Sequence, residues 1–283
     1  MNHTLLSIAA ACLTMATAGT TQPAQRIVSL VPALTEMVFA IGAGDRVIAV
    51  SSFDEDPPAV KNLPRVGALL DPDVERIIAM RADLVLLYGS QTDLMTQLQR
   101  AAIPYYEYRH AGLAGVTGTI RALGQRVGHE KQAEALAAGI DRRFAALRQR
   151  TASLQKPRTL LVFSRERGAL RNIYASGGRG FLHDMLEAAG GVNIFADIQM
   201  ESVQASSELI LARAPEVILE LRSTDIPPEA ERIAEMGAWK VLASVPAVRN
   251  DRLYFLPGRA LVVPGPNVGE GAEAMRRVLH PRQ

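Results

Sequence analysis

The chain has 283 residues, enough for one large domain or two of ordinary size. Hydrophobic residues make up 48% and charged residues 21%, a globular balance that excludes an intrinsically disordered chain. The formal net charge is only +2, and the 5% of aromatic residues are not interleaved with basic runs. We therefore expect no nucleic-acid partner.

The first 25 residues differ in composition from the rest of the chain. Residues 5–18 carry no charge and end in Ala16-Thr17-Ala18, the small-residue pattern of a signal-peptide cleavage site. This stretch is too short to span a bilayer. Residues 1–3 contain neither Lys nor Arg, so an apolar tail is the alternative. We predict a signal peptide over residues 1–18 and an exported protein.

The single cysteine of the chain, Cys12, lies inside this segment. Cleavage after residue 18 would leave a mature chain without a thiol, and hence without disulfides or thiolate chemistry. The alternative is a lipid anchor on Cys12. Simple cleavage is favoured because Ala9 occupies the position where lipoprotein signals usually have Leu. No later apolar stretch is long enough to predict a membrane-spanning helix.

Short β-rich runs alternate with helix-like segments through the rest of the chain. Runs such as 84–87 (LVLL) and 160–163 (LLVF) are continuously apolar, as in strands buried on both faces of a parallel sheet. Residues 71–75 (DPDVE) predict a helix start, and Gly42 and Gly190 predict helix ends. We predict strands over 26–30, 46–51, 83–88, 104–108, 159–164, 216–221 and 252–256.

One long amphipathic segment, residues 129–155, divides the chain. It contains no proline and one interior glycine, Gly139, and its apolar residues recur at near-helical spacing. Roughly 26 residues predict a rod of about 39 Å, which Pro157 ends. We interpret it as a backbone helix joining an N-terminal lobe (26–125) to a C-terminal lobe (157–283). The alternative is an ordinary surface helix within one domain.

The two sides of this segment resemble each other. Residues 75–86 (ERIIAMRADLVL) match residues 208–219 (ELILARAPEVIL) at a constant offset of 133. The repeat predicts two similar α/β lobes, each a mostly parallel sheet flanked by helices. Because such sheets bind ligands at the carboxyl ends of their strands, we expect a ligand cleft between the lobes.

Several stretches together carry a family resemblance. They are RIVSLVPALTE (26–36), GAGDRVIAVS (42–51), DPP (56–58), LPRVG (63–67), FLHDMLEAAGGVNIFAD (181–197) and residues 239–266. From residue 26 to its end, the chain resembles the helical-backbone (class III) periplasmic substrate-binding proteins. Those proteins serve ABC importers for vitamin B12, haem and iron siderophores. Among them, the chain is most similar to the vitamin B12 (cobalamin) binding proteins.

The resemblance implies two docking residues. In this family one exposed Glu on each lobe docks onto arginines of the membrane permease, and Glu75 and Glu208 match those positions. The alternative is that both acids only favour a helix amino end. The resemblance implies a periplasmic protein that acts as a monomer and has an ABC importer permease dimer as its partner.

The resemblance also implies a set of cleft residues. They are Pro32, Phe53, Asp54, Leu69, Tyr88, Arg165, Arg167, Arg222 and Arg259. Phe53 matches an aromatic position of the cobalamin binders, whereas Leu69 stands where the enteric cobalamin binder has a tryptophan. A second tryptophan of that protein is replaced near Ser202. The resemblance also implies that a haem binder of this group would often present a tyrosine to the haem iron near residues 67–70. This chain has no tyrosine there, which counts against haem. The arginines would suit haem propionates or ferric siderophores, which stay as alternative ligands.

Other motifs predict no further chemistry. Residues 176–181 (SGGRGF) lack the Gly-Lys-Ser/Thr end of a phosphate-binding loop and predict a plain turn. The five histidines lack metal-ligand spacing, although His110, just after the fourth predicted strand, could reach a ligand. No nucleophile elbow is present. We therefore predict a binding protein with no catalytic residue, metal site or resident cofactor; an enzyme on a related two-lobed fold is the distant alternative.

Overall fold

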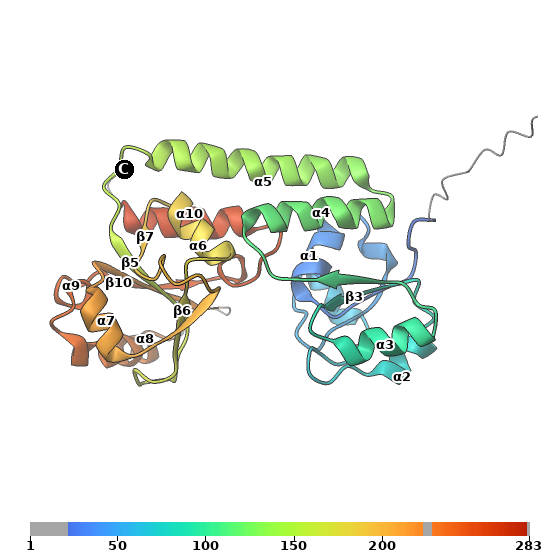
Figure 1. Cartoon of the computed structure of the whole chain (residues 1–283), viewed down its shortest axis with the longest axis horizontal. Coiled ribbons are helices and arrows are strands. Elements are labelled where there is room, and N and C mark those ends of the chain that lie inside the picture. Colours follow the sequence, from blue (N-terminus) through green and yellow to red (C-terminus); the bar gives the residue numbers. More distant parts are fainter. Residues whose placement is uncertain (1–21, 223–227, 282–283) are drawn as a thin grey trace, which may run out of the picture.

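Two α/β lobes lie side by side and are bridged by a layer of helices (Figure 1). The computed structural model describes residues 22–222 and 228–281. The predicted signal peptide over 1–18, with Cys12, lies outside the described residues. Within the described ranges, no helix is both long and apolar enough to cross a membrane.

The first lobe is built on a four-stranded parallel sheet with the order β2-β1-β3-β4. Its strands are β1 (Ile27–Ser29), β2 (Val47–Val50), β3 (Leu84–Tyr88) and β4 (Tyr105–Tyr108). Its helices are α1 (Pro32–Ala40), α2 (Val74–Ala79) and α3 (Thr92–Arg100), with 3-10 turns η1 (Gly44–Arg46) and η2 (Pro58–Asn62).

The apolar run of β3 shows why this sheet is covered on both faces. Leu84 and Leu86 belong to the core on the side of α1, whereas Val85 and Leu87 belong to the core on the side of α2 and α3. Successive strand residues point to opposite faces, so a strand buried on both sides needs apolar residues throughout.

The second lobe has a mixed sheet of six strands. The strands β10 (Leu253–Pro257), β9 (Val217–Arg222), β5 (Arg158–Ser164) and β7 (Val192–Asn193) are parallel. Strand β6 (Ile173–Ser176) runs antiparallel to β5 and to β8 (Ser202–Ala205). The other elements are α6 (Phe181–Ala188), α7 (Ser207–Arg213), α8 (Glu229–Gly237), η3 (Ala238–Leu242), α9 (Pro246–Arg249), η4 (Arg259–Leu261) and α10 (Val268–Leu279).

All seven predicted strands are present, and β6, β7 and β8 were not predicted. Gly42 and Gly190 follow α1 and α6 with positive φ, as predicted for helix ends. The predicted start of α2 was misplaced, because Asp73 rather than Asp71 caps the helix and accepts a hydrogen bond from the Arg76 amide at 3.0 Å.

The predicted rod is helix α5 (Glu130–Thr151), which ends four residues before the predicted residue 155. Its 22 residues give a length of about 33 Å. The buried Thr151 hydroxyl donates to the Ala188 carbonyl oxygen of α6 at 3.1 Å, which fixes the end of α5 against the second lobe. The chain then descends into β5.

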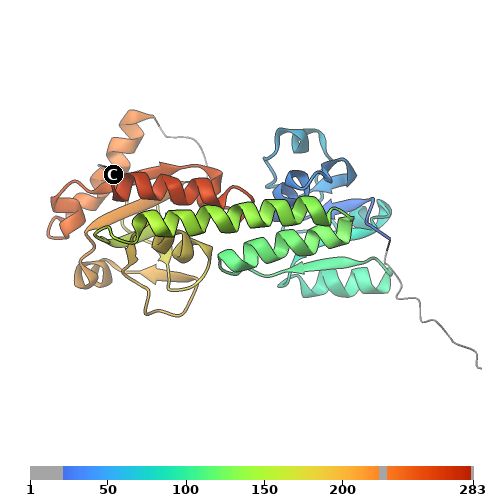
Figure 2. The same cartoon turned by 90° about the horizontal axis from the view of Figure 1, so that it is seen from above.

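Helix α5 is one arm of a helical hairpin. Helix α4 (Leu113–Val127) lies alongside it, and α10 adjoins it over the second lobe (Figure 2). The close approach of α4 and α5 requires small residues: a Cβ on Gly124 would lie 2.3 Å from the Ala133 Cβ.

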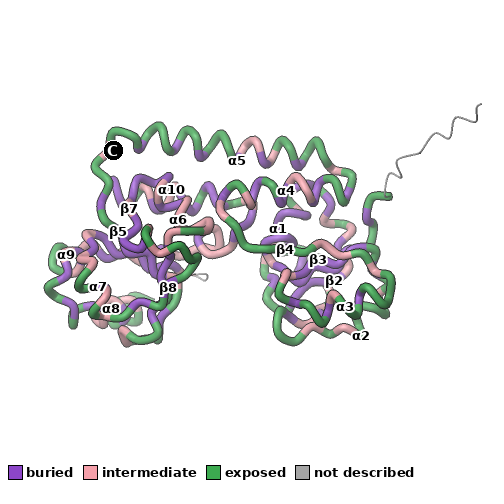
Figure 3. The backbone as a smooth tube through the Cα atoms, in the orientation of Figure 1, coloured by how far each residue is buried: buried purple, intermediate pink, exposed green. Residues whose placement is uncertain are grey.

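A single hydrophobic core runs through this helical layer and into both lobes. It includes Leu34 of α1, Leu123 of α4, Phe144 of α5, Leu186 of α6 and Leu219 of β9. Figure 3 shows the buried inner sides of these helices and the exposed outer side of α5. The two lobes therefore share one apolar core on the side of α5, while their sheets also have separate cores on the other side.

Candidate ligand-binding cleft

The carboxyl ends of the parallel strands carry the residues that border the space between the lobes. In the first lobe, Tyr88 ends β3 and His110 follows β4. In the second lobe, Ser164 ends β5 and Arg222 ends β9. The order of the elements, with each strand followed by a loop or helix, thus brings side chains from distant parts of the sequence to one place.

A cavity of about 440 Å³ lies between the lobes. The first lobe contributes His110 and Ala111, from the connection between β4 and α4. The second lobe contributes an apolar wall made of Phe163, Phe181, Leu182, Leu221 and Val262. It also contributes Gly180 and polar side chains, which are Ser164, Arg179, Glu201, Ser202 and Arg222. A mostly apolar cavity with a few convergent polar groups is typical of a small-molecule site.

The turn over residues 176–181 shapes one side of this cavity. The Asn193 side-chain amide donates to the Gly177 carbonyl oxygen at 2.9 Å, and a Cβ on Gly178 would lie 2.1 Å from the Ala196 carbonyl oxygen. The turn is thereby held close to the chain behind it, and it presents Arg179 and Phe181 to the cavity. The prediction of a plain turn missed this contribution; the glycine cluster was the signal for a close backbone approach.

An aromatic cluster supports the first-lobe side. The rings of Tyr108 and His110 lie 5.2 Å apart, and Tyr88 lies 6.0 Å from Tyr108 and 5.8 Å from His110. Burial raises the pKa of both Tyr88 and Tyr108, so both remain neutral at physiological pH. Tyr88 contacts His110, and of the three rings it is His110 that lines the cavity.

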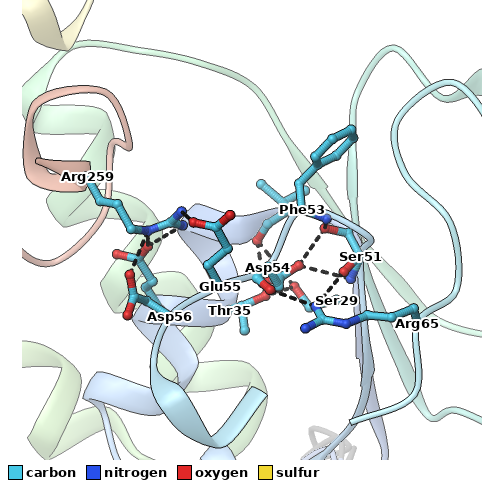
Figure 4. A network of polar contacts seen from close by, with 11 residues as sticks. Ser29, Thr35, Ser51, Phe53, Asp54, Glu55, Asp56, Arg65 and Arg259 are labelled. Carbon is cyan, nitrogen blue, oxygen red and sulfur yellow. Dashed lines mark hydrogen bonds and ion pairs between the residues drawn. The ribbon is translucent and has the colours of Figure 1, made fainter. Parts of the chain in front are cut away.

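Phe53 and Asp54 belong to a loop after β2 whose polar groups bond to one another. The buried Asp54 carboxylate accepts hydrogen bonds from the Ser51 hydroxyl at 2.5 Å and the Ser51 amide at 2.9 Å. The Arg65 guanidinium donates to the carbonyl oxygens of Ser51 and Asp54. Asp54 therefore holds the loop, and Phe53 points away from this network with 70% of its surface exposed (Figure 4).

Arg165 does not line the cavity, contrary to its predicted position. Its side chain is fully buried and pairs with Glu220 at 3.0 Å and Glu235 at 2.7 Å. The Trp239 indole N–H donates to the same Glu220 carboxylate at 3.1 Å. Two buried carboxylates need a buried cation, because an unpaired charge in the interior costs several kcal/mol. Arg165 therefore neutralises buried carboxylates in the core of the second lobe.

Arg259 links the two lobes. Its guanidinium donates to Glu36 of α1 at 3.0 Å and pairs with Glu55 at 3.2 Å and Asp56 at 2.8 Å (Figure 4). All three acids belong to the first lobe and Arg259 to the second. Burial raises the pKa of Glu36, while the hydrogen bond and charge of Arg259 act in the opposite direction.

The other predicted cleft residues are not among those that line the cavity. Pro32 is the first residue of α1, and the exposed Leu69 lies in the loop before α2. Arg167 is exposed and lies 3.7 Å from Glu231. Of the nine predicted residues, all within the described ranges, Arg222 lines the cavity. Ser202, near which the resemblance placed a replaced tryptophan, also lines it.

Glu75 and Glu208 are both exposed, at equivalent positions of α2 and α7. In Figure 1 these helices lie on the side of their lobes away from α5. Among the residues that the structure describes, no group of three or more His, Cys, Asp or Glu side chains could hold a metal ion.

Comparison with known proteins identifies the family of this chain, and the similar proteins are named for two kinds of ligand. The family model described as periplasmic binding protein matches residues 27–260. The chain is 32% identical to the vitamin B12-binding protein of Yersinia pestis (strain Pestoides F) over 200 residues, 70% of each chain. The periplasmic vitamin B12 binding protein BtuF of Vibrio cholerae has a similar structure, with a TM-score of 0.77 and 27% identity, covering 92% of this chain and 99% of that one. The periplasmic heme-binding protein RhuT from Roseiflexus sp. RS-1 also has a similar structure, with a TM-score of 0.73 and 26% identity. The match covers 90% of this chain and 99% of that one.

Proposed function

Because the chain belongs to the periplasmic binding protein family, we propose that it captures a corrinoid outside the cytoplasm and delivers it to an ABC importer permease. The proposed role is binding without catalysis, and the family membership supports it. The observation that carries the ligand proposal is the cavity between the lobes, which is lined by an apolar wall of one lobe and by His110 of the other.

A corrin ring is a large apolar disc with polar amide arms, and the cavity has matching surfaces. Phe163, Phe181 and Leu221 offer an apolar wall for the face of the ring. Glu201 and Ser202 offer acceptors and a hydroxyl for amide groups at its edge. The 32% identity to a vitamin B12-binding protein favours this ligand over others.

Haem is the second candidate, and different groups of the same cavity favour it. Arg179 would pair with one carboxylate of a haem, and Arg222, whose guanidinium also pairs with Glu220 at 2.5 Å, would lie near the other. His110 would offer an imidazole nitrogen to the iron, since histidine is a common metal ligand. The apolar wall suits either flat ring.

Calorimetric titration of residues 19–283 with cyanocobalamin and with haemin distinguishes the two. We expect saturable one-to-one binding of cyanocobalamin with a Kd below about 1 µM. Phe181→Ala should weaken this binding by roughly 10–100-fold, because it removes an aromatic side chain from the wall. Tyr174→Ala is the matched control, because Tyr174 is a partly exposed aromatic on β6 that does not line the cavity.

A folded protein that gives no heat with cyanocobalamin would reject the corrinoid. If haemin then binds and its visible absorption spectrum depends on His110, the haem alternative replaces it. If neither ligand binds, the proposed ligand class is wrong and an iron siderophore is the next to test.

A further inference from the structure

Helices α2 and α7 are the same structural unit, present once in each lobe. Each begins with a side-chain cap: Asp73 accepts from the Arg76 amide at 3.0 Å and Ser206 from the Leu209 amide at 3.2 Å. One turn further, Ile77 and Ile210 are both completely buried. These equivalent positions are separated by the same 133 residues that relate Glu75 to Glu208.

The backbone after the two helices repeats as well. Arg81 and Ala214 both adopt a positive φ, at 51° and 42°, and the following strands β3 and β9 begin at Leu84 and Val217. A non-glycine residue with positive φ is uncommon, so its recurrence at the same offset shows that the two units have the same geometry. Side chains at equivalent positions therefore have equivalent directions within each lobe.

The outer side of each unit carries an acid and an aliphatic residue one turn apart. Ile78 follows Glu75 by three positions and Leu211 follows Glu208 by three, so each pair lies on one face of its helix. Ile78 is 37% exposed and Leu211 41% exposed. Only nine large apolar side chains are exposed in the part of the chain that the structure describes, and two of them occupy this one repeated position.

We propose that Ile78 and Leu211 are paired apolar anchors that, beside Glu75 and Glu208, seat the two lobes on the outer face of a membrane transporter with two related subunits. This inference rests on the proposed transport function and adds the apolar half of the contact. Each subunit would present a basic group for the acid and an apolar surface for the aliphatic side chain.

The charge of each patch argues for this occupant. Glu208 is exposed beside Leu211, and hydrogen bonding from the Ser206 hydroxyl lowers the pKa of its carboxyl group, which further favours the ionised form. A second copy docked by a two-fold axis through this same patch would bring the two Glu208 carboxylates together, which repel each other, whereas a basic partner attracts Glu208. The acid orients the approach, and burial of the neighbouring aliphatic group then slows dissociation.

The test measures binding to spheroplasts of the source organism, so it does not depend on which ligand is transported. Residues 19–283 contain no cysteine, and Ser153→Cys places one fluorescent label beyond the end of α5, away from both patches. We expect saturable binding that unlabelled protein displaces. Ile78→Asp and Leu211→Asp should each weaken it about tenfold, and both together about a hundredfold.

Two features separate the anchors from general surface effects. Ile233→Asp is the matched control, because Ile233 is a 59% exposed aliphatic on α8 outside the repeat, and it should bind like the wild type. Added salt should reduce the contribution of Glu75 and Glu208 to binding of the spheroplasts, because salt screens charges. It should leave the contribution of Ile78 and Leu211 to this binding largely unchanged. Unchanged melting temperatures of all variants show that they are folded.

If Ile78→Asp and Leu211→Asp bind like the wild type while Glu75→Lys with Glu208→Lys does not, the anchor proposal is overturned and the docking function stands. If the charge reversals also have no effect, or saturable binding is absent, the transporter partner itself is rejected. A dimer in sedimentation that Leu211→Asp dissociates would instead assign the surface to self-association and overturn the proposal.

Discussion

Arg259 lies just after β10 in the second lobe and pairs with three carboxylates of the first. Its four shortest contacts use the Nε, Nη1 and Nη2 atoms. Only the planar fork of arginine offers this many donors to several acids at once. We infer that Arg259 joins the lobes at this point, which differs from its predicted role as a ligand contact.

The raised pKa of Glu36 predicts how stability changes with pH. Because burial raises this pKa above its ordinary value of 4.5, the folded protein takes up the proton at a higher pH than the unfolded chain does. The contribution of Glu36 to the free energy of unfolding therefore increases as the pH falls through the folded pKa toward 4.5. We expect the stability of the wild type in urea denaturation, relative to Glu36→Gln, to rise as the pH falls through the folded pKa toward 4.5.

Glu134→Gln provides a control of opposite sign. Hydrogen bonding from Arg121 lowers the pKa of Glu134, so the stability that this carboxylate provides is lost as the pH falls through its folded pKa. Relative to Glu134→Gln, the wild type should therefore lose stability on acidification. Equal pH profiles for the wild type and Glu36→Gln would show that Glu36 does not titrate differently on folding.

At the scale of elements, α4 and α5 form the hairpin that supports both lobes, and two of its glycines have opposite surroundings. Gly124 faces α5, where a Cβ would lie 2.3 Å from the Ala133 Cβ. Gly139 in α5 has open space around its Cβ position. The first glycine is needed for close packing, whereas the second only adds backbone freedom to the unfolded chain.

These surroundings predict substitutions of opposite sign. Gly139→Ala should stabilise the protein by about 0.5–1 kcal/mol, because alanine is more favourable than glycine in the interior of a helix. Gly124→Ala should destabilise it by about 1–3 kcal/mol, because the added methyl group overpacks the contact between α4 and α5. Urea denaturation of the two variants measures both, and a destabilising Gly139→Ala would contradict the open space seen beside α5.

For the whole molecule, the important feature is the core that continues from one lobe to the other. Phe144 of α5, Leu186 of α6 and Leu123 of α4 belong to the same buried cluster as residues of both sheets. Bending the lobes about α5 would open this cluster to water, which costs free energy in proportion to the apolar area exposed. We therefore expect ligand binding to close the cleft only slightly.

Small-angle X-ray scattering with and without ligand tests this rigidity. The radius of gyration should change by less than about 1 Å, in contrast to receptors that close by a hinge. Arg259→Ala is the informative variant: a similarly small change would show that the shared core, and not the ion pairs of Arg259, keeps the lobes in place. A change of several ångströms in the wild type would refute a rigid connection.

The sequence by itself determined those features that depend on neighbouring residues. Apolar runs such as 84–87 predicted buried strands because both faces of the sheet are covered, and the offset of 133 predicted the repeated unit of α2 and α7 because helix caps and strand starts are local. Strand β8 (SVQA) escaped prediction, since Val203 is the one residue among its four that favours a strand.

Only the tertiary structure decided which side chains meet in the cavity. Arg165 follows β5 and Arg222 ends β9, yet Arg165 is buried against the carboxylates of Glu220 and Glu235, 55 and 70 residues away, while Arg222 pairs with Glu220 and also lines the cavity. Charge partners so distant in the chain leave no local pattern. The apolar wall of the cavity, which includes Phe181, was not predicted either. A cavity is formed by the packing of several elements and not by the spacing of residues within one element.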